Sequence, residues 1–302
     1  MKIVQIVGTA RCGSTLLDIC LGTHPDAVNV GELCRLPDRL MQGEQRCSCG
    51  EPLRACTFWN KVLARFREIS PEPDISELGR LEQRLGRIRY LPLHLLGTKF
   101  REREQTRYLE MVGSLYQSLA EISDKDIVVD SSKIPARAWV ATQLNKHGIS
   151  NCLIHLTRDP RGYSWSANRH PHIQQPGFVR SPLDWAITNV ACNAVVKAHT
   201  NGQSLTVRYE DFCRDPAKIA SEIAVTVGID PAPFEQLADS QPQINNDNHL
   251  IDGNYLRFTK KIVISLDTKW QAKLTPRQKS LVWALAGFHA RKYGYRATPI
   301  HG

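Results

Sequence analysis

The sequence predicts an α/β fold of three layers, in which a central parallel sheet carries helices on both faces. Two observations predict it. Short β-branched and apolar runs alternate with helical patterns from each end of the 302-residue chain, which is typical of a parallel sheet. Between about residues 35 and 125 the alternation stops, and helical patterns follow one another with little strand character. With 42% hydrophobic residues, the chain can bury one large core. We therefore expect a single domain over residues 1–302 that contains a helical insertion.

The first strand, loop and helix lie in the stretch Ile3–Leu17, IVQIVGTARCGSTLL. Its first five residues are mostly apolar and β-branched, which predicts a buried strand. A short glycine-bounded loop follows, and two hydroxyl side chains, Ser14 and Thr15, then open a helix. This geometry points backbone N–H groups and the positive end of a helix dipole at one anion. The stretch therefore predicts a P-loop-like phosphate site, to which Arg11 adds a positive charge, although an ordinary strand–helix turn has the same pattern.

One position separates this loop from that of the nucleoside triphosphatases. The spacing fits G-x-x-x-x-G-K-[ST], except that Ser14 stands where the motif has lysine. Because that lysine reaches the β and γ phosphates, a triphosphate is disfavoured. We expect instead a single 5′-phosphate with a reactive group beyond it.

The later elements follow in order along the chain. Strands are expected at Ala27–Val30, Ile127–Asp130, Asn151–Thr157 and Ser204–Arg208. Inside the insertion, helices are expected at Thr57–Ile69, Ile75–Arg89 and Arg101–Ile122. After it, one helix is expected to run through Ser166, and the others are expected at Pro135–Asn145, Pro182–His199, Pro216–Val227 and Leu274–Tyr293. We expect the insertion to cover the sheet and shape a pocket, the last helix to pack on the sheet, and the polar stretch Gln241–Asn254 to form a loop.

Polar side chains follow several of these strands. Glu32 follows the second strand, and Asp130 to Lys133 and Arg158 to Ser166 follow the next two. The carboxyl ends of parallel strands face one crevice, so these groups are expected to meet the phosphate loop there. Arg158 and Ser166 could hold a second phosphate, Arg11 and Lys133 could neutralise a transferring group, and Glu32 could take a proton from an acceptor. The pattern predicts group transfer from a bisphosphorylated nucleotide.

At this point the chain resembles a known family, the sulfotransferases that use 3′-phosphoadenosine 5′-phosphosulfate (PAPS). The resemblance rests on motifs that occur in the family's order: GTARCGSTLL, HPDAVNVGEL, VVDSSK, LTRDPRGYSWS, VRYEDF and HLIDGNYLR. It is strongest with the tyrosylprotein and carbohydrate branch, and CSCGEPLRACTFW also occurs in bacterial members. The matches run from residue 3 to about residue 295, nearly the whole chain.

The resemblance implies in-line transfer of a sulfuryl group from PAPS, without a metal, to a hydroxyl or amine of a small-molecule acceptor. It implies that the 5′-phosphate is held by the loop residues Arg11, Cys12, Gly13, Ser14 and Thr15. It implies that the remaining nucleotide contacts come from Arg158 and Ser166 at the 3′-phosphate and from Tyr209 and Arg257. Lys133 would stabilise the leaving group and Glu32 would be the base, with the 35–125 insertion as an acceptor lid. Adenosine 3′,5′-bisphosphate (PAP) would be the product.

Other interpretations remain open. The chain could be a P-loop kinase, which magnesium-dependent ATP turnover would support, or a non-catalytic protein that binds a nucleotide or nucleic acid. His170 and His172 are reserve candidates for the base, because some sulfotransferase branches use histidine. Asp130 and Asp159 are expected to be structural, capping turns or orienting neighbours.

The cysteines raise two further expectations. A thiolate at Cys12, beside Arg11 and a helix start, would be unusually reactive. The segment that contains Cys47, Cys49 and Cys56 could bind zinc with Cys34 as a fourth ligand. However, the C-x-C-x6-C spacing is not a usual zinc pattern and no histidine is close in sequence. We therefore favour a local disulfide or plain thiols, and no metal.

Composition limits the partners and the location. The net charge of +9 suits a polyanionic ligand, but no long Lys/Arg block is present, so nucleic acid is disfavoured. No run approaches the ~18 apolar residues of a membrane span, and the start of the chain is no export signal. Nine cysteines without such a signal indicate reduced thiols. We expect a cytoplasmic enzyme that tailors a secondary metabolite. The sequence does not determine the acceptor, hydroxyl versus amine transfer, or the oligomeric state.

Overall fold

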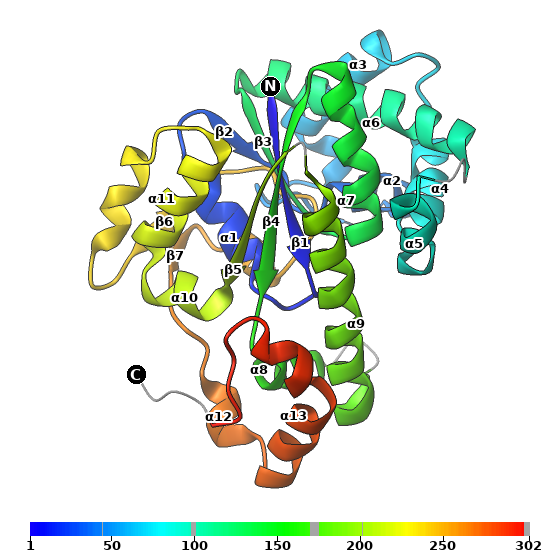
Figure 1. Cartoon of the computed structure of the whole chain (residues 1–302). Coiled ribbons are helices and arrows are strands. Elements are labelled where there is room, and N and C mark those ends of the chain that lie inside the picture. Colours follow the sequence, from blue (N-terminus) through cyan, green and yellow to red (C-terminus); the bar gives the residue numbers. More distant parts are fainter. Residues whose placement is uncertain (44, 98–100, 170–174, 201, 299–302) are drawn as a thin grey trace.

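Parallel strands form the central sheet of the computed structural model (Figure 1), which describes residues 1–43, 45–97, 101–169, 175–200 and 202–298. The sheet has five strands within this part of the chain, in the order β2-β3-β1-β4-β5. Their bounds are β1 (Lys2–Gly8), β2 (Ala27–Asn29), β3 (Ile127–Lys133), β4 (Ser150–Thr157) and β5 (Gln203–Arg208). From β1 the chain first builds β2 and β3 on one side and then β4 and β5 on the other. The strand order therefore reverses at β1, where open α/β sheets bind ligands.

The strands are buried because helices cover both faces of the sheet. In β1 every residue from Ile3 to Gly8 is buried, which explains its near-continuous apolar run. Val4 pairs with Val129 of β3 and with Cys152 of β4. The expected parallel sheet and the positions of its strands are confirmed.

Two helical layers cover the sheet (Figure 1). One face carries α1 (Ser14–Leu21), α10 (Tyr209–Arg214) and α11 (Pro216–Val227). The other face carries α6 (Glu102–Ser123), α7 (Pro135–Thr142) and α9 (Gly177–Ala198). Helix α9 begins five residues before the expected Pro182, which lies inside the helix. The three layers predicted from the sequence are therefore present.

The insertion is helical, as expected. Its helices are α2 (Leu36–Gln42), α3 (Thr57–Ile69), α4 (Ile75–Leu85), α5 (Leu91–Leu95) and α6, which gather on one side of the sheet in Figure 1. Trp59 of α3 and Tyr116 of α6 share one buried cluster with Ile3 and Val128 of the sheet. The insertion therefore packs directly on the sheet rather than standing apart from it.

The C-terminal helix α13 (Pro276–Arg291) does not pack mainly on the sheet, and this expectation was wrong. It lies against α8 (Pro160–Ala167) and α9, beyond the carboxyl ends of the strands, close to α12 (Lys269–Lys273) (Figure 1). Ala286 and Ala290 of α13 are buried with Tyr163 and Trp185. Both sheet faces are already covered, so the apolar side of α13 packs on helices instead.

The expected loop Gln241–Asn254 contains a short strand, which corrects a second prediction. Strand β6 (Gln243–Asn245) pairs antiparallel with β7 (Lys261–Val263), and Ile244 and Ile262 are buried between exposed neighbours. A strand of three residues buries one side chain, so it produces no readable periodicity. Short 3-10 segments complete the chain: η1 (Leu33–Arg35), η2 (Leu53–Ala55), η3 (Ile88–Tyr90), η4 (Gln143–His147), η5 (Ala232–Ala238) and η6 (Tyr255–Phe258).

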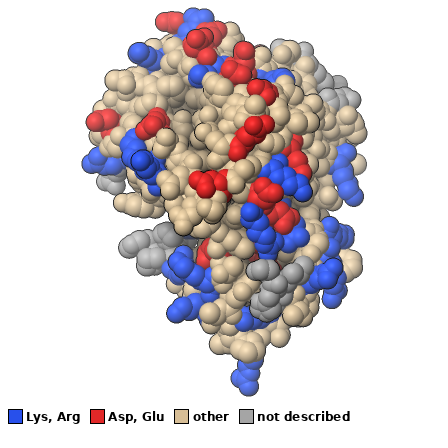
Figure 2. Space-filling model, turned by 90° about the vertical axis from the view of Figure 1, so that its left-hand side faces the viewer, with Lys and Arg blue, Asp and Glu red and all other residues tan. Residues whose placement is uncertain are grey.

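Charges of both signs are interspersed over the face shown in Figure 2. This mixing agrees with the lack of a long Lys/Arg block in the sequence. Within the described residues, none of the helices combines the length and the apolar character that crossing a membrane requires.

Candidate active site

The loop between β1 and α1 has a backbone that few residues can adopt. Arg11 has a φ of 63° and Gly13 a φ of 98°. A Cβ on Gly13 would lie 2.4 Å from the Tyr209 ring, so only glycine fits there. The N–H groups of Leu16 and Leu17 donate to the Gly13 carbonyl, and α1 therefore begins directly after it. The N-terminal N–H groups of a helix point toward an anion bound at that end.

A cavity of about 530 Å³ lies at the carboxyl ends of the strands, where this loop opens. The sequence-predicted residues that line it are Arg11, Gly13, Ser14, Thr15, Glu32, Lys133, Arg158, Ser166 and Tyr209. The fold thus brings together groups that are almost 200 residues apart in the chain. The crevice expected from the parallel sheet is present.

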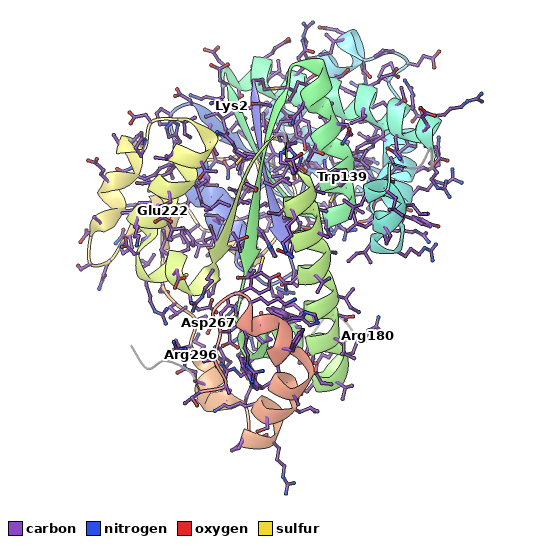
Figure 3. The ribbon with its side chains drawn as sticks, viewed as in Figure 1. Lys2, Trp139, Arg180, Glu222, Asp267 and Arg296 are labelled. Atoms are coloured by element: carbon purple, nitrogen blue, oxygen red, sulfur yellow. The ribbon has the colours of Figure 1, made fainter. Side chains whose placement is uncertain are left out.

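Arg158, at the end of β4, is held in place from three sides. Its Nη1 donates to the Arg11 carbonyl at 3.1 Å, and its Nη2 donates to Asp267 Oδ2 at 3.2 Å. The guanidinium carbon lies 4.5 Å from the centre of the Tyr209 ring. Figure 3 shows Asp267 beyond the lower ends of the strands, toward the C-terminal helices. The side chain is 7% exposed, so its position is fixed before any anion binds.

Glu32 and Lys133 form an ion pair at neighbouring strand ends. Lys133 Nζ lies 2.5 Å from Glu32 Oε1, and the two side chains are 12% and 17% exposed. Lys133 has a φ of 68°, and Gly31, just before Glu32, a φ of 74°. Lys133 Nζ also donates to the Ser131 carbonyl at 3.2 Å. A carboxylate and an ammonium group are therefore positioned beside the phosphate loop.

The two aspartates expected to be structural do have structural partners. Asp130 accepts hydrogen bonds from Tyr116, Ser132 and Arg137. Asp159 caps α8 by accepting from the Arg161 N–H and also pairs with that side chain at 2.7 Å. These bonds satisfy both carboxylates without a ligand.

Cys12 is not a reactive thiol, which corrects a sequence-based expectation. Its side chain is fully buried in the core cluster beneath α1. Burial raises the pKa of the thiol, so the thiolate and its access to reagents are both disfavoured. Only the backbone of Cys12 can serve an anion.

Other predicted residues lie behind the cavity or outside the described residues. Arg257 is buried, donates to the Gly253 carbonyl at 3.0 Å and lies 3.8 Å from Asp252. It therefore supports a lining segment instead of lining the cavity itself. His170 and His172 lie outside the described residues.

Comparison with known proteins identifies the family. A family model described as "Sulfotransferase family" matches residues 4–233, which is most of the chain. The chain belongs to the sulfotransferase family. No curated protein matches the sequence.

A solved sulfotransferase structure shares the fold. The chain is similar to the sulfotransferase domain of the Synechococcus PCC 7002 olefin synthase, with 20% identity, a TM-score of 0.52 and coverage of 99% of this chain and 96% of that one. A sulfotransferase domain from the curacin biosynthetic pathway aligns with 18% identity and a TM-score of 0.49, over 96% of this chain and 97% of that one. At such identities the likeness to the first structure shows the fold alone.

This sulfotransferase lines its cavity with further residues that the sequence did not predict. The basic ones are Arg169, which follows α8, and Lys269, at the start of α12. Asp252, Gly253 and Asn254 add a wall, and the Asn254 N–H donates to Thr15 Oγ1 at 3.0 Å. The Gly-Asn motif was visible in the sequence. No motif marked Arg169 or Lys269, whose places at the cavity depend on how the elements around them pack.

Proposed function

We propose that this sulfotransferase moves the sulfuryl group of PAPS to a hydroxyl or amine of a small-molecule acceptor. One observation carries the proposal. A single cavity contains a phosphate loop with Arg11, a second basic position at Arg158, and the Glu32–Lys133 ion pair beside the loop. Two positions for anions in one cavity suit a nucleotide with phosphates at both ends of its ribose.

The nucleotide would lie across the carboxyl ends of β1 and β4. The 5′-phosphate would accept hydrogen bonds from the backbone N–H groups at the start of α1, including those of Gly13 and Ser14. The side chains of Ser14, Thr15 and Arg11 would also donate to it. The 3′-phosphate would pair with Arg158 and Ser166, and it would share the Arg158 guanidinium with Asp267. The Tyr209 ring packs against the Arg158 guanidinium, and Arg257 holds the Gly253 segment by donating to its carbonyl.

The transfer would proceed in line with Glu32 as the base. The acceptor oxygen or nitrogen forms a bond to sulfur while the bond from sulfur to the bridging oxygen breaks. The acceptor proton passes to Glu32, and PAP leaves with the bridging oxygen stabilised by Lys133. The Glu32–Lys133 ion pair would separate when the acceptor binds. Glu32 would then face the acceptor, and Lys133 would face the bridging oxygen of the leaving group. Positioning and charge carry such a loose transition state.

The acceptor side remains a prediction. None of the described residues between 35 and 125 lines the cavity, so a lid role for the insertion would require acceptor contacts outside it. The insertion touches this region through Arg39, which pairs with the lining residue Asp252 at 2.7 Å. Tailoring of a secondary metabolite likewise stays a prediction from the sequence.

Calorimetric titration with PAP, without magnesium, tests the nucleotide site. We expect micromolar binding to the wild type, weakened by about 2 kcal/mol or more in Arg158→Ala, the scale of a charged hydrogen bond. Arg180→Ala is the matched control, since Arg180 is exposed on α9 away from the strand ends (Figure 3) and pairs only loosely with Asp184. If the folded wild-type protein does not bind PAP but hydrolyses or transfers phosphate from ATP with magnesium, the kinase interpretation would be favoured.

Transfer of a labelled sulfuryl group to a panel of phenols, alcohols and amines tests the base. Glu32→Gln should lower transfer by about 10²–10⁴-fold, the usual contribution of a general base. PAP affinity should change little, because Glu32 faces the acceptor. Full transfer activity in a folded Glu32→Gln variant would remove Glu32 from the mechanism.

A further inference from the structure

Three cysteines and one histidine that are distant in sequence lie together beside the insertion. They are Cys47, Cys49, Cys56 and His249, and their possible ligand atoms all lie within 4.8 Å of one another. His249 is 193 residues from Cys56, which is why no histidine was visible near the cysteines in the sequence. Cys34, the fourth ligand considered there, is not in this group. Its backbone N–H instead donates to Ser132 Oγ.

The spacing of these atoms matches a tetrahedron around one zinc ion. With Zn–S bonds of about 2.3 Å and Zn–N bonds of about 2.0–2.1 Å, two sulfurs lie about 3.8 Å apart, and a sulfur and a nitrogen about 3.5 Å apart. The Cys49 and Cys56 sulfurs are 3.8 Å apart. His249 Nδ1 lies 3.5 Å from the Cys47 sulfur and 3.3 Å from the Cys56 sulfur. Three of the six pairs of ligand atoms are thus already near the distances of a zinc site, and all pairs lie within 4.8 Å.

The surrounding structure orients the histidine. The His249 ring stacks on Phe58, with centroids 4.7 Å apart and planes 9° apart. Trp59 Nε1 donates to the His249 carbonyl at 2.8 Å. Both aromatic residues belong to α3, which begins directly after Cys56. Outer contacts of this kind are what hold metal ligands in their binding geometry.

A tight turn brings the first two cysteines together. The Gly50 N–H donates to the Cys47 carbonyl at 2.9 Å, and Gly50 has a φ of 97°. Ser48 ties this turn to the histidine's segment: its N–H donates to the Leu250 carbonyl and its Oγ accepts from the Leu250 N–H at 2.8 Å. The backbone on both sides of the four ligands is therefore fixed by hydrogen bonds.

We propose that Cys47, Cys49, Cys56 and His249 bind one zinc ion in a structural site. Three sulfurs and an imidazole form a soft ligand set that suits zinc. Four protein ligands leave no open position for a substrate, so the site is structural and not catalytic. The ligand atoms are too close together to surround an iron–sulfur cluster. On binding, the thiols release their protons to solvent and coordinate as thiolates.

The position of the site indicates which parts of the structure the ion would hold together. It would join the insertion to the segment that starts at His249 and forms one wall of the cavity. The Ile251 N–H donates to the Val30 carbonyl, two residues before Glu32, at 3.1 Å. The Asn254 N–H then reaches Thr15 Oγ1 in the phosphate loop. Zinc would therefore hold this wall against the sheet without touching the reacting groups.

Elemental analysis of the purified full-length chain tests the proposal. We expect about one zinc per chain in the wild type. His249→Ala should lose most of it, while His249→Cys should retain it by completing a four-cysteine set. Cys34→Ala is the matched control and should keep the full metal content, because Cys34 lies outside the group. Cobalt added to zinc-free protein should give the absorption bands of a tetrahedral thiolate site.

Several results would overturn it. The proposal would be overturned if the wild-type protein contains no zinc as purified and takes up neither zinc nor cobalt. It would also be overturned by a Cys49–Cys56 disulfide in protein purified under reducing conditions. If His249→Ala fails to fold, wild-type metal content and His249→Cys still decide the question. Removing zinc with a chelator should lower the melting temperature by several degrees. Metal content does not depend on PAP, so this test can succeed or fail independently of the proposed function.

Discussion

Replacing Arg137 with methionine should destabilise the protein strongly, because Arg137 is the only charge partner that two buried carboxylates have among the described contacts. The Arg137 side chain is 1% exposed. Its Nη1 lies 2.7 Å from Asp130 Oδ2, and its Nε lies 3.1 Å from both carboxylate oxygens of Glu82. Tyr108 and Tyr116 also donate to these carboxylates. The network joins α4 of the insertion to β3 and α7.

Burial sets the size of the effect. Burial raises the pKa of Tyr108 and Tyr116 well above the usual value, so both stay donors and cannot replace the lost positive charge. Removing one partner of a buried ion pair costs about 3–5 kcal/mol, because the remaining charge is left without compensation. An exposed pair contributes at most about 1 kcal/mol. Arg84→Met is the matched control, since Arg84 lies on α4 like Glu82 and pairs with Glu104 at the same 2.7 Å, but its side chain is 57% exposed.

Urea unfolding followed by circular dichroism measures the difference between the two variants. We expect a large loss of stability in Arg137→Met, which adding Glu82→Gln partly restores, and a small loss in Arg84→Met. Burial raises the pKa of Glu82, so the Arg137→Met defect should shrink as the pH falls and Glu82 becomes protonated. Asp130 also positions Ser132, the neighbour of Lys133, so under the proposed mechanism sulfuryl transfer should fall as well. Equal losses of stability in Arg137→Met and Arg84→Met would refute the reasoning.

Three further predictions concern other parts of the chain. Burial lowers the pKa of His155 to about 4. Between about pH 6.5 and pH 4, His155 therefore binds a proton in the unfolded chain but not in the folded chain. Stability should therefore fall by about 3 kcal/mol as the pH drops from about 6.5 to about 4, and pH-dependent melting should be flatter in His155→Gln. Gly13→Ala should weaken PAP binding at least about tenfold, because its Cβ would meet the Tyr209 ring at 2.4 Å. Gly148→Ala has a similar φ but open space around it, and unchanged PAP titration in both variants would contradict the clash. Arg169→Ala should lower PAP affinity several-fold and reduce its dependence on salt; equal affinities at low and high salt would exclude a charge contact.

Most of the fold could be predicted from the sequence because its signals are local. The buried strand at Ile3–Val7 is legible from its β-branched run, and α3 and α11 have the bounds that periodicity and prolines indicated. The exceptions lack a local signal. Helix α13 has an apolar side whatever it packs on, and β6 buries a single residue.

The site divides in the same way. Its strand-end residues were predictable because parallel strands place their carboxyl ends at one edge. The burial of Cys12 was not, because the direction of a side chain in a left-handed loop depends on what packs beneath it. Arg169 and Lys269 also needed the structure, since the chain around them returns to the cavity from beyond the sheet.

By itself, the sequence determined the layered α/β fold, the glycine-bounded loop after the first strand and the residues at the strand ends, and its motifs identified the family by resemblance. The fold, the loop and the strand ends follow from neighbours in the chain or from the geometry that every parallel sheet shares. Only the tertiary structure decided which partners meet across long distances: Arg158 with Asp267, Arg137 with Glu82, and His249 with the cysteines of the insertion. Such contacts depend on how whole elements pack, and no short stretch of sequence carries that information.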